Sequence, residues 1–113
     1  MKKIAIVAFK GEMPCFVHAL LNLWNYHMKG YETKLIIEGM ATERILDMEE
    51  SSKKELWKSI KAANLISSVC MACSVQTNSL EAAKNQGLPI DNSLSGHSDL
   101  EPFTQSGYEI IIF

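Results

Sequence analysis

Apolar residues along this chain fall in short continuous runs separated by longer segments of mixed polarity. Four such runs cover residues 3–9, 31–38, 65–69 and 108–113. Continuous runs of this length are typical of strands covered on both faces of a sheet. A fifth and shorter run, residues 88–90, contains a proline, which restricts a strand to a sheet edge or to its own first residue. The pattern therefore predicts four buried strands and one short edge strand.

The segments between these runs predict helices. Residues 14–29 begin with a proline, which suits a first helical turn, and are followed by Gly30, a typical helix cap. The polar stripe of this helix consists of His18, Asn22, Asn25 and Lys29. Nearly all its other residues are apolar, more than one sheet face would cover, which predicts a subunit interface.

Further helices are predicted later in the chain. Ser-x-x-Glu capping boxes begin at Ser52 and Ser98, and we expect a helix to begin at each. Residues 43–50 suggest a helical turn or two, and another helix is expected to run from Asn78 to Gln86. Strands that alternate with helices predict an α/β fold with a mostly parallel sheet and helices on both faces. The length of 113 residues suits a single domain spanning residues 1–113.

Composition limits the function classes. The charged fraction is 21% and the net charge is -2, which disfavours a nucleic-acid-binding protein, because such proteins carry a clustered basic face. No apolar run approaches the roughly 18 residues expected of a membrane span. We interpret residues 1–9 as a first strand and not as a signal peptide. Three cysteines without an export signal predict free thiols in the cytoplasm.

The strongest chemical signal is Cys70-x-x-Cys73, directly after the third apolar run. Ligands of open α/β sheets bind at the carboxyl ends of the strands, so loops 10–15, 39–42 and 70–73 should converge there. A thiolate is the reactive form of cysteine, and its pKa is often lowered in Cys-x-x-Cys motifs. His97 lies in a loop that would join this edge, as a base or hydrogen-bond partner for sulfur. We expect Cys73, Cys70 and His97 to be the reactive residues.

Two other interpretations remain open. The cysteines can be inert and buried, or they can bind zinc, which needs four ligands in a structural site. Cys15, Cys70, Cys73 and His97 would supply three sulfurs and one nitrogen near the same edge. Nothing in the sequence resembles a phosphate-binding loop or a dinucleotide-binding fingerprint, so nucleotide binding has no support. We expect no cofactor, with zinc as the alternative.

Several segments together resemble the DsrE/DsrF-like (YchN-like) family of small cytoplasmic proteins. Residues 3–7 resemble its first strand, and residues 19–39 resemble its first helix and second strand. Val69 to Cys73 lies where the family carries its sulfur-handling cysteine, and residues 107–112 resemble its last strand. Two cysteines stand here where the family's sulfur-relay members usually have one, so the carrier is either Cys73 or Cys70.

The resemblance implies a three-layer fold with a five-stranded parallel sheet and assembly into trimers or hexamers. It also implies that a cysteine persulfide accepts sulfane sulfur from a donor protein and passes it to an acceptor protein. We therefore predict a cytoplasmic sulfur-carrier or thiol protein, a sulfur transferase in the broad sense, without a nucleic-acid or membrane partner. The alternative is a non-catalytic oligomeric binding module whose cysteines bind zinc or are structurally buried.

Overall fold

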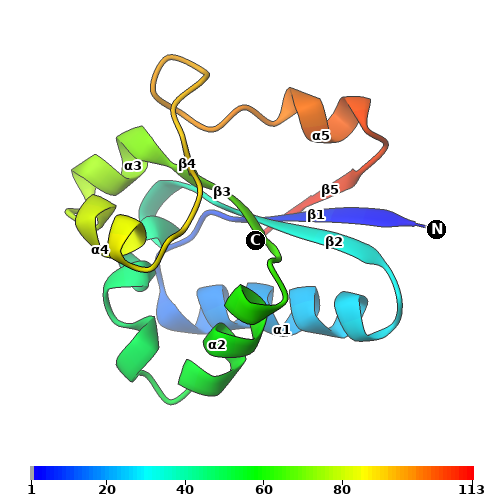
Figure 1. The fold of residues 1–113 in the computed structure, drawn as a ribbon, viewed down its shortest axis with the longest axis horizontal. Helices are drawn as coiled ribbons and strands as arrows, with labels where there is room; N and C mark the ends of the chain where they lie inside the picture. The colour runs from blue at the N-terminus through cyan, green and yellow to red at the C-terminus, as the bar shows by residue number, and fades with distance from the viewer. Residues whose placement is uncertain (1) are drawn as a thin grey trace.

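A five-stranded sheet with the strand order β4-β3-β2-β1-β5 forms the centre of the molecule (Figure 1). The computed structural model describes residues 2–113. All four pairs of neighbouring strands are parallel, which confirms the predicted fold class. The strands are β1 (Lys3–Ala8), β2 (Glu32–Ile37), β3 (Ile66–Cys70), β4 (Ile90–Asp91) and β5 (Glu109–Ile112).

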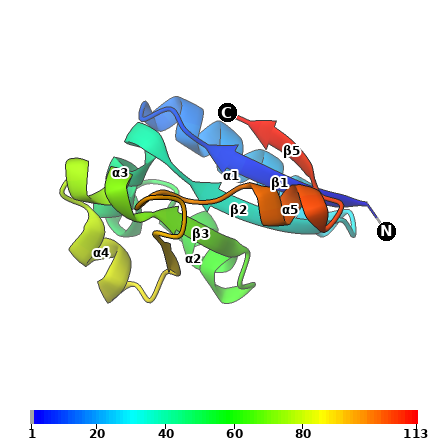
Figure 2. The same ribbon diagram turned by 90° about the horizontal axis from the view of Figure 1, so that it is seen from above.

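Helices cover both faces of the sheet, as predicted. The helices α1 and α2 lie on one face and α5 lies on the other, while α3 and α4 lie beyond the carboxyl ends of the central strands (Figures 1 and 2). None of the helices within residues 2–113 is long and apolar enough to cross a membrane. The helices are α1 (Met13–Met28), α2 (Lys54–Ala62), α3 (Met71–Gln76), α4 (Leu80–Asn85) and α5 (Glu101–Gln105), with the 3₁₀ segments η1 (Gly39–Leu46) and η2 (Met48–Glu50) after β2.

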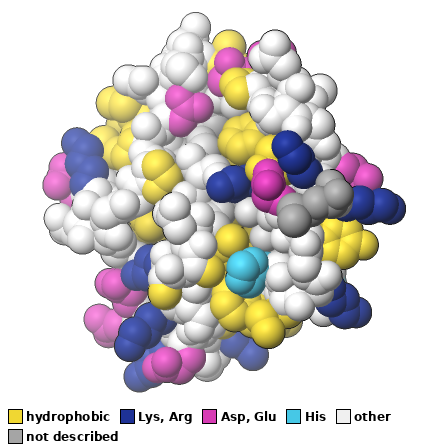
Figure 3. Space-filling model, turned by 45° about the vertical axis from the view of Figure 1, so that its right-hand side comes forward, with side chains coloured by type: hydrophobic (Ala, Val, Ile, Leu, Met, Phe, Trp, Pro, Cys, Tyr) yellow, Lys and Arg dark blue, Asp and Glu magenta, His cyan; other side chains and the backbone are white. Residues whose placement is uncertain are grey.

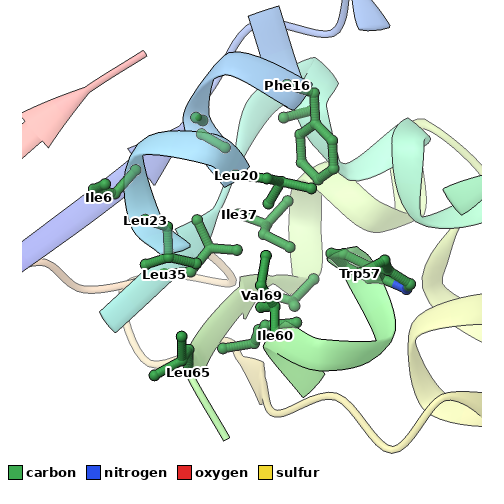
Figure 4. Close-up of a cluster of buried hydrophobic side chains, with 14 of the residues drawn as sticks. Ile6, Phe16, Leu20, Leu23, Leu35, Ile37, Trp57, Ile60, Leu65 and Val69 are labelled. Atoms are coloured by element: carbon green, nitrogen blue, oxygen red, sulfur yellow. The ribbon is translucent and has the colours of Figure 1, made fainter. Parts of the chain in front are cut away.

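The two faces of the sheet bury cores of unequal size. Successive side chains of a strand point to opposite faces. In β1, Ile4 and Ile6 therefore join the large core beneath α1 and α2, while Ala5 and Val7 join a small core beneath α5. Figure 4 shows the large core, in which side chains of the two helices converge on those of the central strands.

The first helix is only partly covered by the sheet. Its buried residues are Phe16, Ala19, Leu20 and Leu23. Leu21 is 48% exposed and Met28 is 67% exposed. The sequence pattern thus identified an apolar surface that one sheet face does not cover.

The predicted starts of three helices were wrong. The helix expected to begin at Asn78 is α4, which begins at Leu80. A separate helix, α3, begins directly after Cys70. The capping boxes at Ser52 and Ser98 do not form, because neither α2 nor α5 has a side-chain cap. The Ser98 hydroxyl instead lies 2.6 Å from the Ser68 hydroxyl on β3 and is buried there.

Trp57 of α2 is the largest fully buried side chain of the core, and truncating it should strongly destabilise the fold. Its ring packs 6.0 Å from that of Phe16, and its Nε1 donates a hydrogen bond to Gln86 Oε1 at 2.9 Å. We expect Trp57→Ala to lower the free energy of unfolding by about 3–5 kcal/mol, because it leaves a large cavity. Urea denaturation measures this loss. Lys58→Ala, at an exposed neighbouring position, should change the stability little.

Candidate functional site

The two cysteines of the motif lie at a junction where strand passes directly into helix. Cys70 is the last residue of β3 and is fully buried, while Cys73 lies in the first turn of α3 and is partly exposed. Cys70 directly precedes α3, and residues three apart at a helix start face the same side, so the two thiols are neighbours. The two sulfurs and a ring nitrogen of His97 all lie within 4.8 Å of one another.

His97 belongs to the loop after β4, and its Nδ1 lies within 4 Å of both sulfurs. The distance from Nδ1 to Cys70 Sγ is 3.4 Å and that to Cys73 Sγ is 3.9 Å. The imidazole itself is exposed. One ring nitrogen can thus exchange a proton with either thiol.

Backbone hydrogen bonds hold the loop that carries His97. The amide of Ala72, in the first turn of α3, donates to the carbonyl of Gly96 at 2.8 Å. Leu94 and His97 exchange two backbone hydrogen bonds, at 2.9 and 3.1 Å. The loop is therefore attached to the same helical turn that carries Cys73.

The carboxylate of Asp91 fixes the two ends of this loop. It accepts hydrogen bonds from the backbone amides of Ser93 and Asp99, both at 2.9 Å. Burial by itself would raise the pKa of Asp91, but the hydrogen bonds from Ser93 and Asp99 outweigh it and leave the pKa below its usual value. A carboxylate that accepts several amide hydrogen bonds is stabilised in its charged form.

Buried hydroxyl groups attach α3 to the segment after β2. Thr42 Oγ1 lies 2.8 Å from the carbonyl oxygen of Gly39 and 2.8 Å from Thr77 Oγ1. Thr77 in turn lies 2.8 Å from Ser79 Oγ. The chain of hydroxyls ties η1 to the end of α3, and it fixes how far Cys73 stands from Gly39.

A pocket of about 330 Å³ opens beside these residues. The thiol of Cys73 and the ring of His97 contribute to its wall, whereas Cys70 does not. Gly39 has φ of +56°, and a Cβ there would come within 2.9 Å of Phe9. The wall consists of Phe9, Glu38, Gly39, Met40, Cys73, Gln76, Thr77 and His97.

The surroundings of Cys73 favour the neutral thiol. Burial and the hydrogen bond with Cys70 raise the pKa of Cys73 to about 11, against a smaller lowering by the Gly39 backbone amide. Burial also raises the pKa of Glu38, while the nearby His97 acts in the opposite direction. The lowered thiol pKa that is common in Cys-x-x-Cys motifs is therefore not found at Cys73.

Three of the four sequence-predicted residues come together and the fourth does not. Cys70, Cys73 and His97 form one group, while Cys15 lines a different pocket, of about 420 Å³, with His18 and Phe113. The strand order explains this separation, because β2 lies between β3 and β1. The first turn of α1 lies next to the end of β5, away from the thiol pair.

Several residues that shape the site had no individual sequence signal. Thr42, Thr77 and Ser79 act through a buried network that only the fold assembles. The density of hydroxyl residues at positions 74–79 was the one visible hint. Asp91 directly follows the apolar run 88–90 and is the last residue of β4, and a carboxylate at such a strand end could have been singled out.

Comparison with known proteins identifies relatives but no activity. The chain is 34% identical to the uncharacterized protein MJ0733 of Methanocaldococcus jannaschii, over 96% of this chain and 93% of that protein. It belongs to the same family as MJ0733. An uncharacterized protein of Archaeoglobus fulgidus is 47% identical over 45% of this chain and 84% of its own length.

The fold also occurs in a solved structure. A conserved protein of unknown function from Bacteroides thetaiotaomicron, BT1422, superposes with a TM-score of 0.74 over 99% of this chain and 95% of its own. The sequences are 14% identical, so the likeness concerns the fold alone. No family model matches the chain.

The raised pKa predicts how the reactivity of Cys73 depends on pH. Only the thiolate is alkylated, so its rate should rise about tenfold for each unit of pH up to the pKa, and it should level off only near pH 11. Mass spectrometry of the Cys73 peptide after timed alkylation measures this rate. Cys70→Ala removes a group that raises the pKa, so the plateau should then appear at lower pH. A plateau that moves upward in this variant would contradict the assignment.

Proposed function

We propose that this protein is a sulfur carrier in which Cys73 accepts sulfane sulfur and passes it to a partner protein. The observation that supports this most is the arrangement around one sulfur atom. Cys73 lines a pocket, has the imidazole of His97 at 3.9 Å, and has a second thiol beside it. Cys70 is buried, so a donor reaches Cys73 first.

The transfer step needs no external oxidant. The Cys73 thiolate attacks the outer sulfur of a donor persulfide, the new bond forms between these two sulfurs, and the donor's own sulfur–sulfur bond breaks. The donor leaves as a thiolate and Cys73 becomes a persulfide. The proton of the Cys73 thiol moves to His97 and then to the leaving thiolate.

The raised pKa of Cys73 suits a carrier that must not react at random. A neutral thiol is a poor nucleophile, so the resting protein is protected from oxidants and stray electrophiles. A bound donor brings its sulfur within reach of a thiol whose proton acceptor is already in place. Holding reacting groups together in this way replaces intrinsic reactivity.

The resemblance to DsrE/DsrF-like proteins supports the same proposal, because sulfur relay is known among that family's members. In this proposal the partners are a sulfur donor protein and an acceptor protein, and neither nucleic acid nor membrane takes part. The exposed apolar side chains of Phe9 and Met40 flank the pocket and would contact such partners. The reducing cytoplasm is the compartment in which the two thiols would stay free.

Incubation with a sulfane-sulfur donor tests the proposal. We expect the reduced protein to gain the mass of one sulfur atom on the peptide that contains Cys73. Cys73→Ser should abolish the gain, and His97→Gln should slow it several-fold because the proton acceptor is lost. The matched control is Cys15→Ser, which should load normally because Cys15 lies in another pocket. No gain in the wild-type protein would contradict the proposal.

We also propose that the protein assembles into a homo-oligomer, a trimer or hexamer, through α1 and β5. Leu21 and Met28 on α1 and Ile112 on β5 are 48%, 67% and 64% exposed. The helix and the end of β5 form one continuous surface, since the rings of His18 and Phe113 lie 5.3 Å apart. The strand β5 is also a sheet edge, and an unpaired edge is a template for further contacts. Figure 3 shows one face on which hydrophobic side chains gather around a histidine.

Light scattering coupled to size-exclusion chromatography measures the assembly. We expect the mass of a trimer or hexamer for the wild-type chain. Leu21→Glu combined with Met28→Glu should shift it toward the monomer, because a charge in an apolar interface is costly. Leu46→Glu changes a comparably exposed leucine on η1 and should leave the assembly intact. A wild-type monomer at micromolar concentration would contradict the proposal.

A further inference from the structure

We propose that Cys70, Cys73 and His97 form a binding site for a zinc-like transition-metal ion, with three protein ligands and a fourth position open to the pocket. This differs from the four-ligand site expected from the sequence, because Cys15 lies elsewhere. Within residues 2–113, these three residues form the group of potential metal ligands whose ligand atoms lie within 4.8 Å of one another.

The distances from the His97 nitrogen to the two sulfurs are close to those of a tetrahedral site. Zinc binds sulfur at about 2.3 Å and imidazole nitrogen at about 2.0–2.1 Å. At tetrahedral angles, these bond lengths place neighbouring sulfur and nitrogen ligands about 3.5 Å apart. His97 Nδ1 lies 3.4 Å from Cys70 Sγ and 3.9 Å from Cys73 Sγ. The two sulfurs lie within 4.8 Å of each other, against about 3.8 Å for two sulfurs bound at tetrahedral angles. An ion can therefore enter with shifts of up to about 1 Å.

The ligand set selects the class of ion. Two thiolates and one imidazole suit zinc, and also cobalt or cadmium used as probes, whereas magnesium and calcium prefer oxygen. The two thiolates together carry the charge that balances a divalent cation. The set of two cysteines and one histidine is also a known three-ligand arrangement for zinc with an exchangeable fourth position.

The ligands are held in place without an ion. Cys70 is fixed at the end of a buried strand, and Cys73 follows one helical turn later. The His97 loop is attached to that same turn by the hydrogen bond from Ala72 to Gly96 and is braced by Asp91. Ligands that are already positioned lose little conformational entropy when the ion binds.

The fourth position faces the pocket. Two of the three ligands, Cys73 and His97, line the pocket, whereas Cys70 lies behind them. A ligand that completes the tetrahedron therefore comes from the pocket side, as water or as a small thiolate or hydrosulfide anion. Glu38 lines the same pocket beside them, although its oxygens lie outside the group of three.

Occupancy by the ion would also control sulfur transfer, and this consequence rests on the proposed function. A metal bound to both cysteines engages the sulfur lone pairs that would attack a donor. The metal-loaded protein should then accept no sulfane sulfur until the ion is removed. The binding of the ion itself does not depend on whether the protein carries sulfur.

Cobalt titration of the reduced, full-length protein without oxygen tests the site. We expect one cobalt ion per chain, a thiolate-to-cobalt charge-transfer band and the intense visible bands of tetrahedral cobalt, all abolished by zinc. Cys70→Ser, Cys73→Ser and His97→Ala should each weaken binding by at least tenfold, while circular dichroism checks that each variant is folded. Cys15→Ser is the matched control and should bind as the wild type does. Absence of binding, octahedral cobalt bands, or loss of binding in Cys15→Ser would overturn the site.

A second measurement separates the site from the proposed function. The zinc-loaded and metal-free proteins are each incubated with the sulfane-sulfur donor and analysed by mass spectrometry. Control by the metal is supported if only the metal-free protein takes up sulfur and if a chelator restores sulfur uptake to the zinc-loaded protein. Equal uptake by both overturns that control. If neither form takes up sulfur while cobalt still binds, the sulfur-carrier function fails and the metal site stands.

Discussion

The direct passage from β3 into α3 is the constraint on which the candidate site depends. The strand ends at Cys70 and the helix begins at the next residue, so no loop separates the two cysteines. The Ser74 hydroxyl donates to the Cys70 carbonyl at 2.7 Å and is fully buried. A flexible connection would let Cys73 move away from Cys70, and the pair would then have no fixed relation to the pocket.

A second constraint comes from the short edge strand β4. It pairs with only the last two residues of β3, Val69 and Cys70, so the chain leaves the sheet beside the buried cysteine. The loop that follows therefore returns over α3 and carries His97 to the sulfurs. The hydrogen bonds that fix this loop contribute about 0.5–1.5 kcal/mol each. Together they are enough to favour one loop position over many.

The sequence predicted the architecture well because the sheet is buried on both faces. Runs such as residues 3–9 and 31–38 are recognised as strands without an alternation of polar and apolar residues. Because the strands are parallel, the loops that follow them lie at one edge of the sheet. The site was harder. The short helix α3 has no clear apolar period, since Ser74 and the following Thr77 are polar. Hydroxyl contacts from Thr42 to the Cys73 carbonyl and to Thr77 stabilise it, and these exist only in the folded chain. Cys15 was grouped with the pair because all carboxyl ends share an edge, but strand order decides which of them are neighbours.

Burial of the thiols affects the proposed sulfur carrier and the proposed metal site in the same way. Taking a thiol out of water disfavours its anion, and this holds Cys73 neutral in the resting protein. A divalent cation reverses that balance, because a metal-coordinated thiol loses its proton. A persulfide is more acidic than the thiol from which it forms, so sulfur loading changes the balance in the same direction. Cys73 therefore stays a neutral thiol until a ligand arrives and favours its anion, which is the property expected of either a carrier or a metal site.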